Sequence, residues 1–315
     1  MNAIHGYPHG PGQTLADRGS TVDLANGTAD PTPRWLAVAR LGSLRTGSGF
    51  SIWMQLRGRT RITAREGVFS LGPGEWLALD RDSAPELQAG RHGATLGVMF
   101  PADAVGRARG ELLPGHERMS ARDLRIAIRL WRNGADAVRI HGGDDAVGRA
   151  LQSMLLHLSA LQRGLDGGVS RCPGRSVRRK RQVFGRLQRA RLFLEGHSHR
   201  VVRLTELAEL TSFSSWYLSK TFHDIYDESP QAASVRLRLE RACELLAATD
   251  CSIGEVGAAC GFDNSCSFAR AFRMRYRTTA TAYRESMRID AKVGTGTNPG
   301  AQSRRSAQNV MLSSV

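Results

Sequence analysis

The C-terminal third of the chain contains an internal near-duplication, which constrains the fold more than any other feature. The segment LTELAELTSF at 204–213 is echoed by IGEVGAACGF at 253–262, an offset of 49 residues. Each copy is followed by an apolar triplet at fourfold spacing: Leu218, Phe222 and Tyr226 after the first, and Phe268, Phe272 and Tyr276 after the second. Such a repeat implies that one supersecondary unit is used twice.

Each copy predicts a short helix, a turn of about three residues and a second helix, which is a helix-turn-helix arrangement. Ser214 is suited to cap the second helix of the first unit, and Ser252 with Glu255 forms a capping-box pattern at the start of the second unit. Gly261 can take the positive φ that a tight inter-helix turn requires. The buried triplets then determine which face of each second helix is exposed.

In the first unit the exposed stripe has four side chains at helical spacing, Trp216, Ser219, Lys220 and His223. In the second unit the exposed positions are Ser265, Cys266, Ala269, Arg270 and Arg273. Base edges in the major groove offer acceptors, donors and the thymine methyl, and a guanidinium can bind guanine through two hydrogen bonds. These helices therefore suit reading of DNA, although a tryptophan such as Trp216 can also simply pack against a neighbouring helix.

A regular helix from Pro230 to Leu246 is predicted between the two units. Val235 and Leu239 are expected on its inner face, and Arg236, Arg238 and Arg241 on its outer face. Such a spacer could set the two reading helices about one DNA turn, ~34 Å, apart.

Positive charge gathers in the same region. The chain has 44 Lys+Arg against 29 Asp+Glu, a net charge of +15, and residues 170–193 contain nine of these basic residues and no acid. This excess favours a polyanionic partner. Candidate contacts to the DNA backbone are therefore Arg178, Arg179, Lys180, Arg181, His223 and Arg273.

The N-terminal part has a different pattern. Residues 33–118 show strand-like alternation punctuated by glycines, which indicates a small antiparallel barrel or sandwich. Residues 119–169 are expected to be helical, and apolar residues recur there at spacings of four and three: Val147, Leu151, Met154, Leu158, Leu161 and Leu165. This seam could cover the chain's own barrel or form a homodimer contact.

The remaining features exclude several classes of protein. Residues 1–32 and 289–315 lack periodicity and are expected to be disordered, and 170–182 is expected to be a basic linker. The start lacks the regions of a signal peptide and no stretch is apolar enough to span a membrane, so we expect a cytoplasmic protein. The five cysteines include no C-x-x-C pair, which argues against disulfides and structural zinc.

The C-terminal region resembles the AraC/XylS family of transcriptional regulators. The resemblance covers roughly 183–286, within an expected domain at 183–288. It is carried by LTELA at 204–208, S-x3-L-S-K-x-F at 214–222, Ser-Pro at 229–230, the long segment at 236–272 and Tyr283-Arg284. It implies an all-α domain with two helix-turn-helix units joined by a linker helix. By resemblance, the base contacts are assigned to Trp216, Ser219, Lys220, Ser265, Cys266, Ser267 and Arg270.

The chain departs from the family pattern at several positions. Asp227 and Arg277 stand where the family usually has glycine after each second helix, Ala280 replaces the usual proline, and Ser212 replaces glycine in the first turn. Aspartate tolerates a left-handed helix end at modest cost, whereas arginine is less suited to it.

Residues 56–87 resemble the cupin-like sensor domain of many family members. The implied fold class is α+β and multidomain, a cupin-like β-barrel sensor followed by the helical domain. Candidate residues for an effector pocket are Trp53, Trp76 and Phe100, although large apolar side chains in a small barrel are more often core. No metal-binding set of the cupin type occurs between residues 45 and 105, where His92 stands alone.

We therefore expect a sequence-specific DNA-binding regulator, an activator and not an enzyme, without a cofactor. Its expected partners are double-stranded DNA, RNA polymerase, a small-molecule effector and a second copy of the chain, with no membrane. The alternatives are nonspecific architectural DNA binding, for which the basic segment would suffice, and a cupin-type metalloenzyme, which the missing ligand set disfavours.

Overall fold

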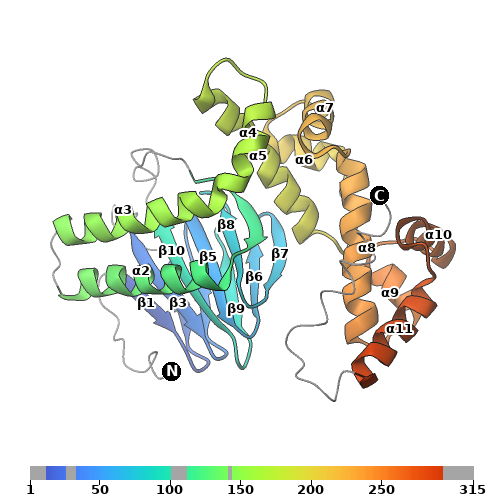
Figure 1. The fold of residues 1–315 in the computed structure, drawn as a ribbon, viewed down its shortest axis with the longest axis horizontal. Helices are drawn as coiled ribbons and strands as arrows, with labels where there is room; N and C mark the ends of the chain where they lie inside the picture. Colours follow the sequence, from blue (N-terminus) through green and yellow to red (C-terminus); the bar gives the residue numbers. More distant parts are fainter. Residues whose placement is uncertain (1–11, 26–32, 101–111, 141–143, 294–315) are drawn as a thin grey trace. The chain divides into compact units, whose positions relative to one another are not determined.

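A computed structural model describes residues 12–25, 33–100, 112–140 and 144–293 of the chain (Figure 1). The chain divides into two compact units. The first comprises residues 1–197 and 202–231, and the second comprises residues 198–201 and 232–315. The first helix-turn-helix unit therefore belongs to the same compact unit as the N-terminal strands.

Two sheets form the N-terminal part of the first unit. The six-stranded sheet has the order β1 (Gln13–Ala16), β3 (Arg34–Ala39), β10 (Ala94–Phe100), β5 (Phe50–Arg57), β8 (Glu75–Leu79) and β11 (Gly115–Arg118). The five-stranded sheet has the order β2 (Thr21–Asp23), β4 (Ser43–Arg45), β9 (Glu86–Ala89), β6 (Thr60–Ala64) and β7 (Gly67–Leu71). The pairs β1–β3 and β2–β4 are parallel, and the other pairs are antiparallel.

The prediction of a cupin-like barrel is wrong, because the described strands form two open sheets and no closed barrel. The six-stranded sheet is a central layer with both faces buried. In β8, Trp76 belongs to the core on one face and Leu77 to the core on the other. Alternation in a strand is the same in a barrel and in a stacked sheet, so the sequence pattern could not distinguish them.

Residues 13–23 also differ from the expectation of a disordered N-terminus, because they contain β1 and β2. Both strands gain their hydrogen bonds from partners distant in sequence: Gln13 aligns with Trp35, and Thr21 aligns with Ser43. Composition does not reveal such long-range pairing. The segments 1–11, 26–32 and 294–315 lie outside the described residues.

Helices α2 (Ala121–Ile140) and α3 (Asp144–Leu161) cover the outer face of the six-stranded sheet (Figure 1). Trp131 of α2 is buried there, and its indole Nε1 donates to the Gly97 carbonyl at 2.9 Å. The apolar seam of α3 packs into the same core through Met154 and Leu158. The seam therefore covers the chain's own sheet, which is one of the two arrangements that its spacing allows.

The first unit continues through five short or medium helices: η1 (Gln162–Leu165), α4 (Asp166–Arg171), α5 (Val177–Gly196), α6 (Leu204–Thr211) and α7 (Ser215–Tyr226). Both ends of the expected linker 170–182 are thus helical. Leu192 of α5 enters the core between the two sheets. Arg189, also on α5, pairs with Glu66 and Asp82 at 2.7 Å each.

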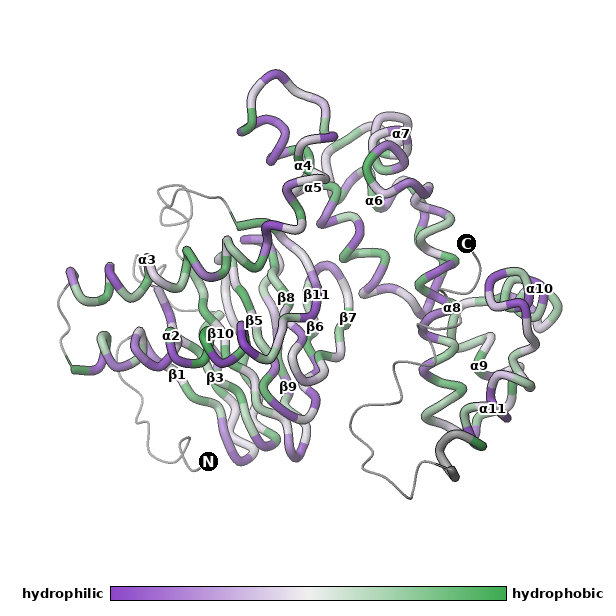
Figure 2. Tube along the Cα trace, in the orientation of Figure 1, coloured by the Kyte–Doolittle hydropathy of each residue, from purple (hydrophilic) through white to green (hydrophobic). Residues whose placement is uncertain are grey.

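The second unit is all helical and consists of α8 (Pro230–Ala248), α9 (Ile253–Ala259), α10 (Ser265–Tyr276) and α11 (Ala280–Val293). Leu239, Val256, Phe268 and Phe272 form the centre of its core. Hydropathy alternates along these helices as expected for elements with one buried face (Figure 2). In the described part of the chain, no helix has the length and apolarity needed to cross a bilayer.

Candidate DNA-binding interface

The first helix-turn-helix consists of α6 and α7. Ser212 ends α6 in a left-handed conformation with φ 53°, where the family pattern has glycine. Ser214 caps α7, since its hydroxyl accepts a hydrogen bond from the Tyr217 N–H at 3.2 Å. Leu218 and Phe222 are buried beneath α7, and the Tyr226 hydroxyl donates to Gln188 of α5 at 2.7 Å. These contacts determine which face of α7 is exposed.

That face carries the side chains that the sequence assigned to DNA. Trp216 is 71% exposed, and the Lys220 ammonium lies 5.3 Å from the centre of its ring. His223 is exposed and Ser219 is half-buried. The large aromatic side chain thus lies in solvent beside a cation, and it does not pack against a neighbouring helix.

The second helix-turn-helix consists of α9 and α10. Ser252 and Glu255 form a reciprocal capping box at the start of α9. Gly261 turns the chain with φ +73°, and a Cβ at this position would lie 2.7 Å from the Arg200 Cα, so glycine is required there. Asn264 caps α10 by accepting the Ser267 N–H at 2.8 Å. Phe268 and Phe272 are fully buried beneath the helix.

The outer face of α10 carries the remaining predicted base contacts, since Ser265, Cys266, Ser267 and Arg270 are all exposed. The Ser267 hydroxyl donates to the Asn264 carbonyl at 2.8 Å, so it takes part in the helix cap as well. Arg273 is exposed one turn further along. Within unit two, α10 therefore presents a guanidinium, a thiol and hydroxyls on one surface.

The basic segment before the first unit divides into two kinds of residue. Arg178 and Arg179 are exposed. Lys180 and Arg181 instead tie α5 to α4: the Lys180 ammonium donates to the Ser170 carbonyl at 2.8 Å, and Arg181 lies 3.5 Å from the Asp166 carboxylate. The first two are the freer candidates for phosphate contacts.

Two arginines outside the predicted set hold the ends of helices. Arg171 donates to the Ile225 carbonyl at the end of α7 and to the Asp227 carboxylate, the latter at 3.2 Å. Arg238 was expected on the outer face of the spacer helix, but it is buried. Its guanidinium donates to the carbonyls of Cys260 and Gly261 at 2.7 and 2.6 Å.

The buried position of Arg238 has a physical reason. The last carbonyls of a helix lack partners within the helix and carry partial negative charge, so a cation is stabilised beside them. The Arg238 guanidinium also lies 4.1 Å from the centre of the Phe262 ring. Helical periodicity indicates on which face of α8 Arg238 lies, but it does not reveal that the C-terminal end of α9 lies against that face.

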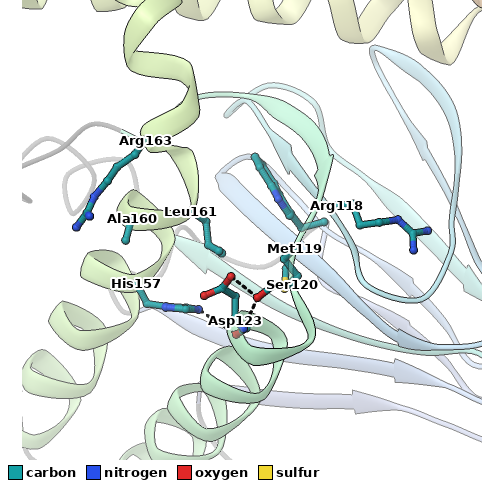
Figure 3. Close-up of a pocket in the computed structure, with 9 residues that line it drawn as sticks. Arg118, Met119, Ser120, Asp123, His157, Ala160, Leu161 and Arg163 are labelled. Carbon is teal, nitrogen blue, oxygen red and sulfur yellow. Dashed lines mark hydrogen bonds between the residues drawn. The ribbon is translucent and has the colours of Figure 1, made fainter. Parts of the chain in front are cut away.

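The three residues expected to line one effector pocket do not lie around one cavity in the structure. Trp53 lies in the core between the sheets, and Phe100 lies in the core beneath α2 and α3. Trp76 borders a cavity of about 360 Å³ beside the start of α2 and the end of α3 (Figure 3). The other residues around this cavity are Arg118, Met119, Ser120, Asp123, His157, Ala160, Leu161 and Arg163.

A family model described as a helix-turn-helix domain matches residues 207–286. Among curated proteins, the chain is 31% identical to the HTH-type transcriptional regulator CdhR of Pseudomonas aeruginosa over 128 residues, 41% of this chain and 35% of that protein. It is 30% identical to the MmsAB operon regulatory protein of the same organism, over 30% of this chain and 31% of that protein. The chain thus spans about a third of these relatives.

Among solved structures, a transcriptional regulator from Chromobacterium violaceum, described with AraC-type DNA-binding domain-containing proteins, matches 36% of this chain and 95% of its own, with 25% identity and a TM-score of 0.32. The family model matches the C-terminal region that contains the repeat. Residues 207–286 therefore contain a helix-turn-helix domain, and the curated proteins to which the chain is similar are described as regulators.

Proposed function

We propose that this protein is a sequence-specific DNA-binding transcriptional regulator whose two helix-turn-helix units read successive major grooves. The observation that carries the proposal is the surface of the two second helices. Each has a buried aromatic face that holds it in place, and each exposes base-reading groups, with Trp216 and Lys220 on α7 and Arg270 on α10.

The role in transcription follows from the relatives. Both curated relatives named above are regulators, which supports a regulatory and non-enzymatic role for this chain. We propose further that it acts in the cytoplasm as an activator that contacts RNA polymerase.

For the N-terminal part we propose the sensing of a small molecule. The cavity beside Trp76 supports this proposal, because it combines apolar walls at Met119 and Leu161 with polar groups (Figure 3). The His157 ring nitrogen Nε2 lies 3.1 Å from the Asp123 carbonyl, which joins α3 to the start of α2 across the cavity. Pairing of two chains through the α3 seam has less support, because that seam already packs on the sheet.

The test is selection of binding sites from a pool of randomised duplexes, followed by competition of the best site against random DNA. Two reading helices predict a preference of about 1,000-fold or more, with two recognised segments about one helical turn apart. A ratio near unity would instead support architectural binding through the basic segment.

A further inference from the structure

Helix α2 carries a stripe of four arginines outside the helix-turn-helix units. Arg122, Arg125, Arg129 and Arg132 are spaced by three, four and three residues, which places them on one side of the helix over about 15 Å. All four are exposed. We call this set the α2 arginine stripe.

The opposite side of α2 determines where the stripe points. Ala127, Trp131 and Ala135 are buried against the six-stranded sheet, and the Trp131 indole is hydrogen-bonded to Gly97. Rotation of α2 about its axis would expose these side chains. The stripe is therefore held on the outer surface. Hydrophilic and hydrophobic positions alternate along α2 (Figure 2).

Within the described residues, none of the four stripe arginines forms an ion pair. The acid nearest in sequence to Arg132 on its own face is Asp136, and its carboxylate is bound by Arg139 at 3.2 Å. Like charges three or four residues apart repel and destabilise a helix. A surface that weakens its own helix, with no compensating ion pair among the described residues, suggests a function.

We propose that the α2 arginine stripe binds the phosphate backbone of duplex DNA beside the site read by the helix-turn-helix units. This inference rests on the proposed function. Guanidinium groups bind phosphate through two parallel hydrogen bonds, and phosphates recur along each strand without regard to sequence. DNA already bound through the C-terminal domain is present at high effective concentration for a second contact by the same chain.

Composition favours DNA over an acidic protein as the occupant. The core of a protein interface is enriched in apolar and aromatic side chains. In the described structure, the large exposed apolar side chains of α2 and α3 are Ile140 at the end of α2 and Leu156 on α3, and none lies among the four arginines. The surface around the stripe offers cations without an apolar centre, as a phosphate-binding surface does.

The experiment uses the full chain and a duplex obtained by the selection described above, in two lengths. One is the minimal selected site, and the other carries 40 additional base pairs of random sequence on each side. Affinity is measured from about 50 to 200 mM salt. If the four arginines each contact a phosphate, the slope of log affinity against log salt concentration should be steeper by about 3.6 on the long duplex than on the minimal one.

The stripe is tested with Arg125→Gln/Arg129→Gln. The matched control is Arg91→Gln/Arg149→Gln, which removes the same charge from exposed positions outside α2. On the long duplex, the salt slope of the stripe variant should be shallower than that of the wild-type chain by about 1.8. The ratio of the wild-type affinity to the variant affinity should therefore change about tenfold between about 50 and 200 mM salt. On the minimal duplex, neither variant should differ from the wild-type chain.

Three results would overturn the inference: equal slopes for the wild-type chain on both duplexes, equal effects of the two double variants, or unchanged DNA binding with weakened binding of RNA polymerase. The last result would identify an acidic protein as the partner. Loss of preference for the minimal duplex by the wild-type chain would instead contradict the proposed function, so the two failures are distinguishable.

Discussion

At the scale of single residues, α7 and α10 each combine two opposite roles within a few positions. Phe222 is buried and Trp216 is exposed, although both are large aromatic side chains on the same helix. On α10, Phe272 is the buried side chain and Arg270 is the exposed one. Loss of a buried ring removes packing, whereas loss of an exposed group at a proposed reading position is expected to remove only contacts with DNA.

Substitution of the reading residues should therefore separate recognition from folding. We expect Trp216→Ala or Arg270→Ala to weaken binding to the selected duplex by roughly 1 to 3 kcal/mol and to relax discrimination. Arg179→Ala should weaken binding to all duplexes alike and reduce the salt slope by about 1. Fluorescence anisotropy on selected and random duplexes measures both effects, and equal losses on both for all three variants would contradict the assignment.

Phe272→Ala is the contrasting control for these variants. It should lower the free energy of unfolding by about 3 to 5 kcal/mol because the ring is fully buried, and it should abolish DNA binding only when the domain melts. A Phe272→Ala variant with an unchanged melting temperature and no DNA binding would show that the ring is not part of the core.

At the scale of elements, the two reading helices end in the same unusual way. Asp227 after α7 and Arg277 after α10 have φ values of 57° and 58°, in the left-handed region that favours glycine. The N–H of each residue still bonds back to the helix, to the carbonyls of His223 and Arg273 respectively. The helix end is thus formed without glycine, at a cost in backbone strain.

Arg277→Gly should consequently stabilise the chain by about 1 kcal/mol, because glycine adopts this conformation without strain from a Cβ. Asp227→Gly should gain less, since aspartate tolerates the region better and its carboxylate also binds Arg171. Urea unfolding of both variants measures the change. A destabilised Arg277→Gly variant, or a larger gain at Asp227, would show that strain at these positions is not the controlling factor.

In the molecule as a whole, α5 lies between the N-terminal sheets and the first helix-turn-helix unit, and its contacts with the sheets are charged. Arg189 is buried with Glu66 on the sheet side. His116 of β11 is bound to the Glu195 carboxylate of α5, and its other ring nitrogen lies 3.8 Å from Glu75. On its other side, α5 contacts α7 through the hydrogen bond from the Tyr226 hydroxyl to Gln188.

The His116 contact predicts how stability depends on pH. Burial alone would lower the pKa of His116, but attraction to Glu195 and then to Glu75 outweighs it and raises the pKa to about 10. A group whose pKa is raised in the folded state stabilises that state fully when the pH is below the pKa of the group in the unfolded chain, which is about 6.5 for histidine. The stabilisation is lost as the pH rises toward 10. Stability should therefore fall between these two pH values.

Unfolding in urea at a series of pH values checks this dependence, with His116→Gln as the comparison. The variant should be less stable than the wild-type chain at pH 6, and the difference should shrink steadily as pH approaches 10. A difference between the two chains that does not change with pH would mean that His116 is not charged in the folded state.

Local pattern predicted a large part of the fold and of the candidate site. The capping residues Ser214 and Ser252, the turn at Gly261 and the exposed position of Trp216 all follow from spacing, because helical periodicity and capping are properties of neighbouring residues. The roles of Arg171 and Arg238 could not be predicted in this way. Each binds the end of a helix that is distant in sequence.

The repeated helix-turn-helix units and the faces that they bury follow from the amino-acid sequence, since they depend on contacts within about a dozen residues. The two open sheets, the addition of residues 13–23 to them and the packing of the α3 seam on the chain's own core became clear from the three-dimensional fold. Pairing between distant segments and the choice of packing partner depend on the whole chain, and alternation along one strand or helix is compatible with several of these arrangements.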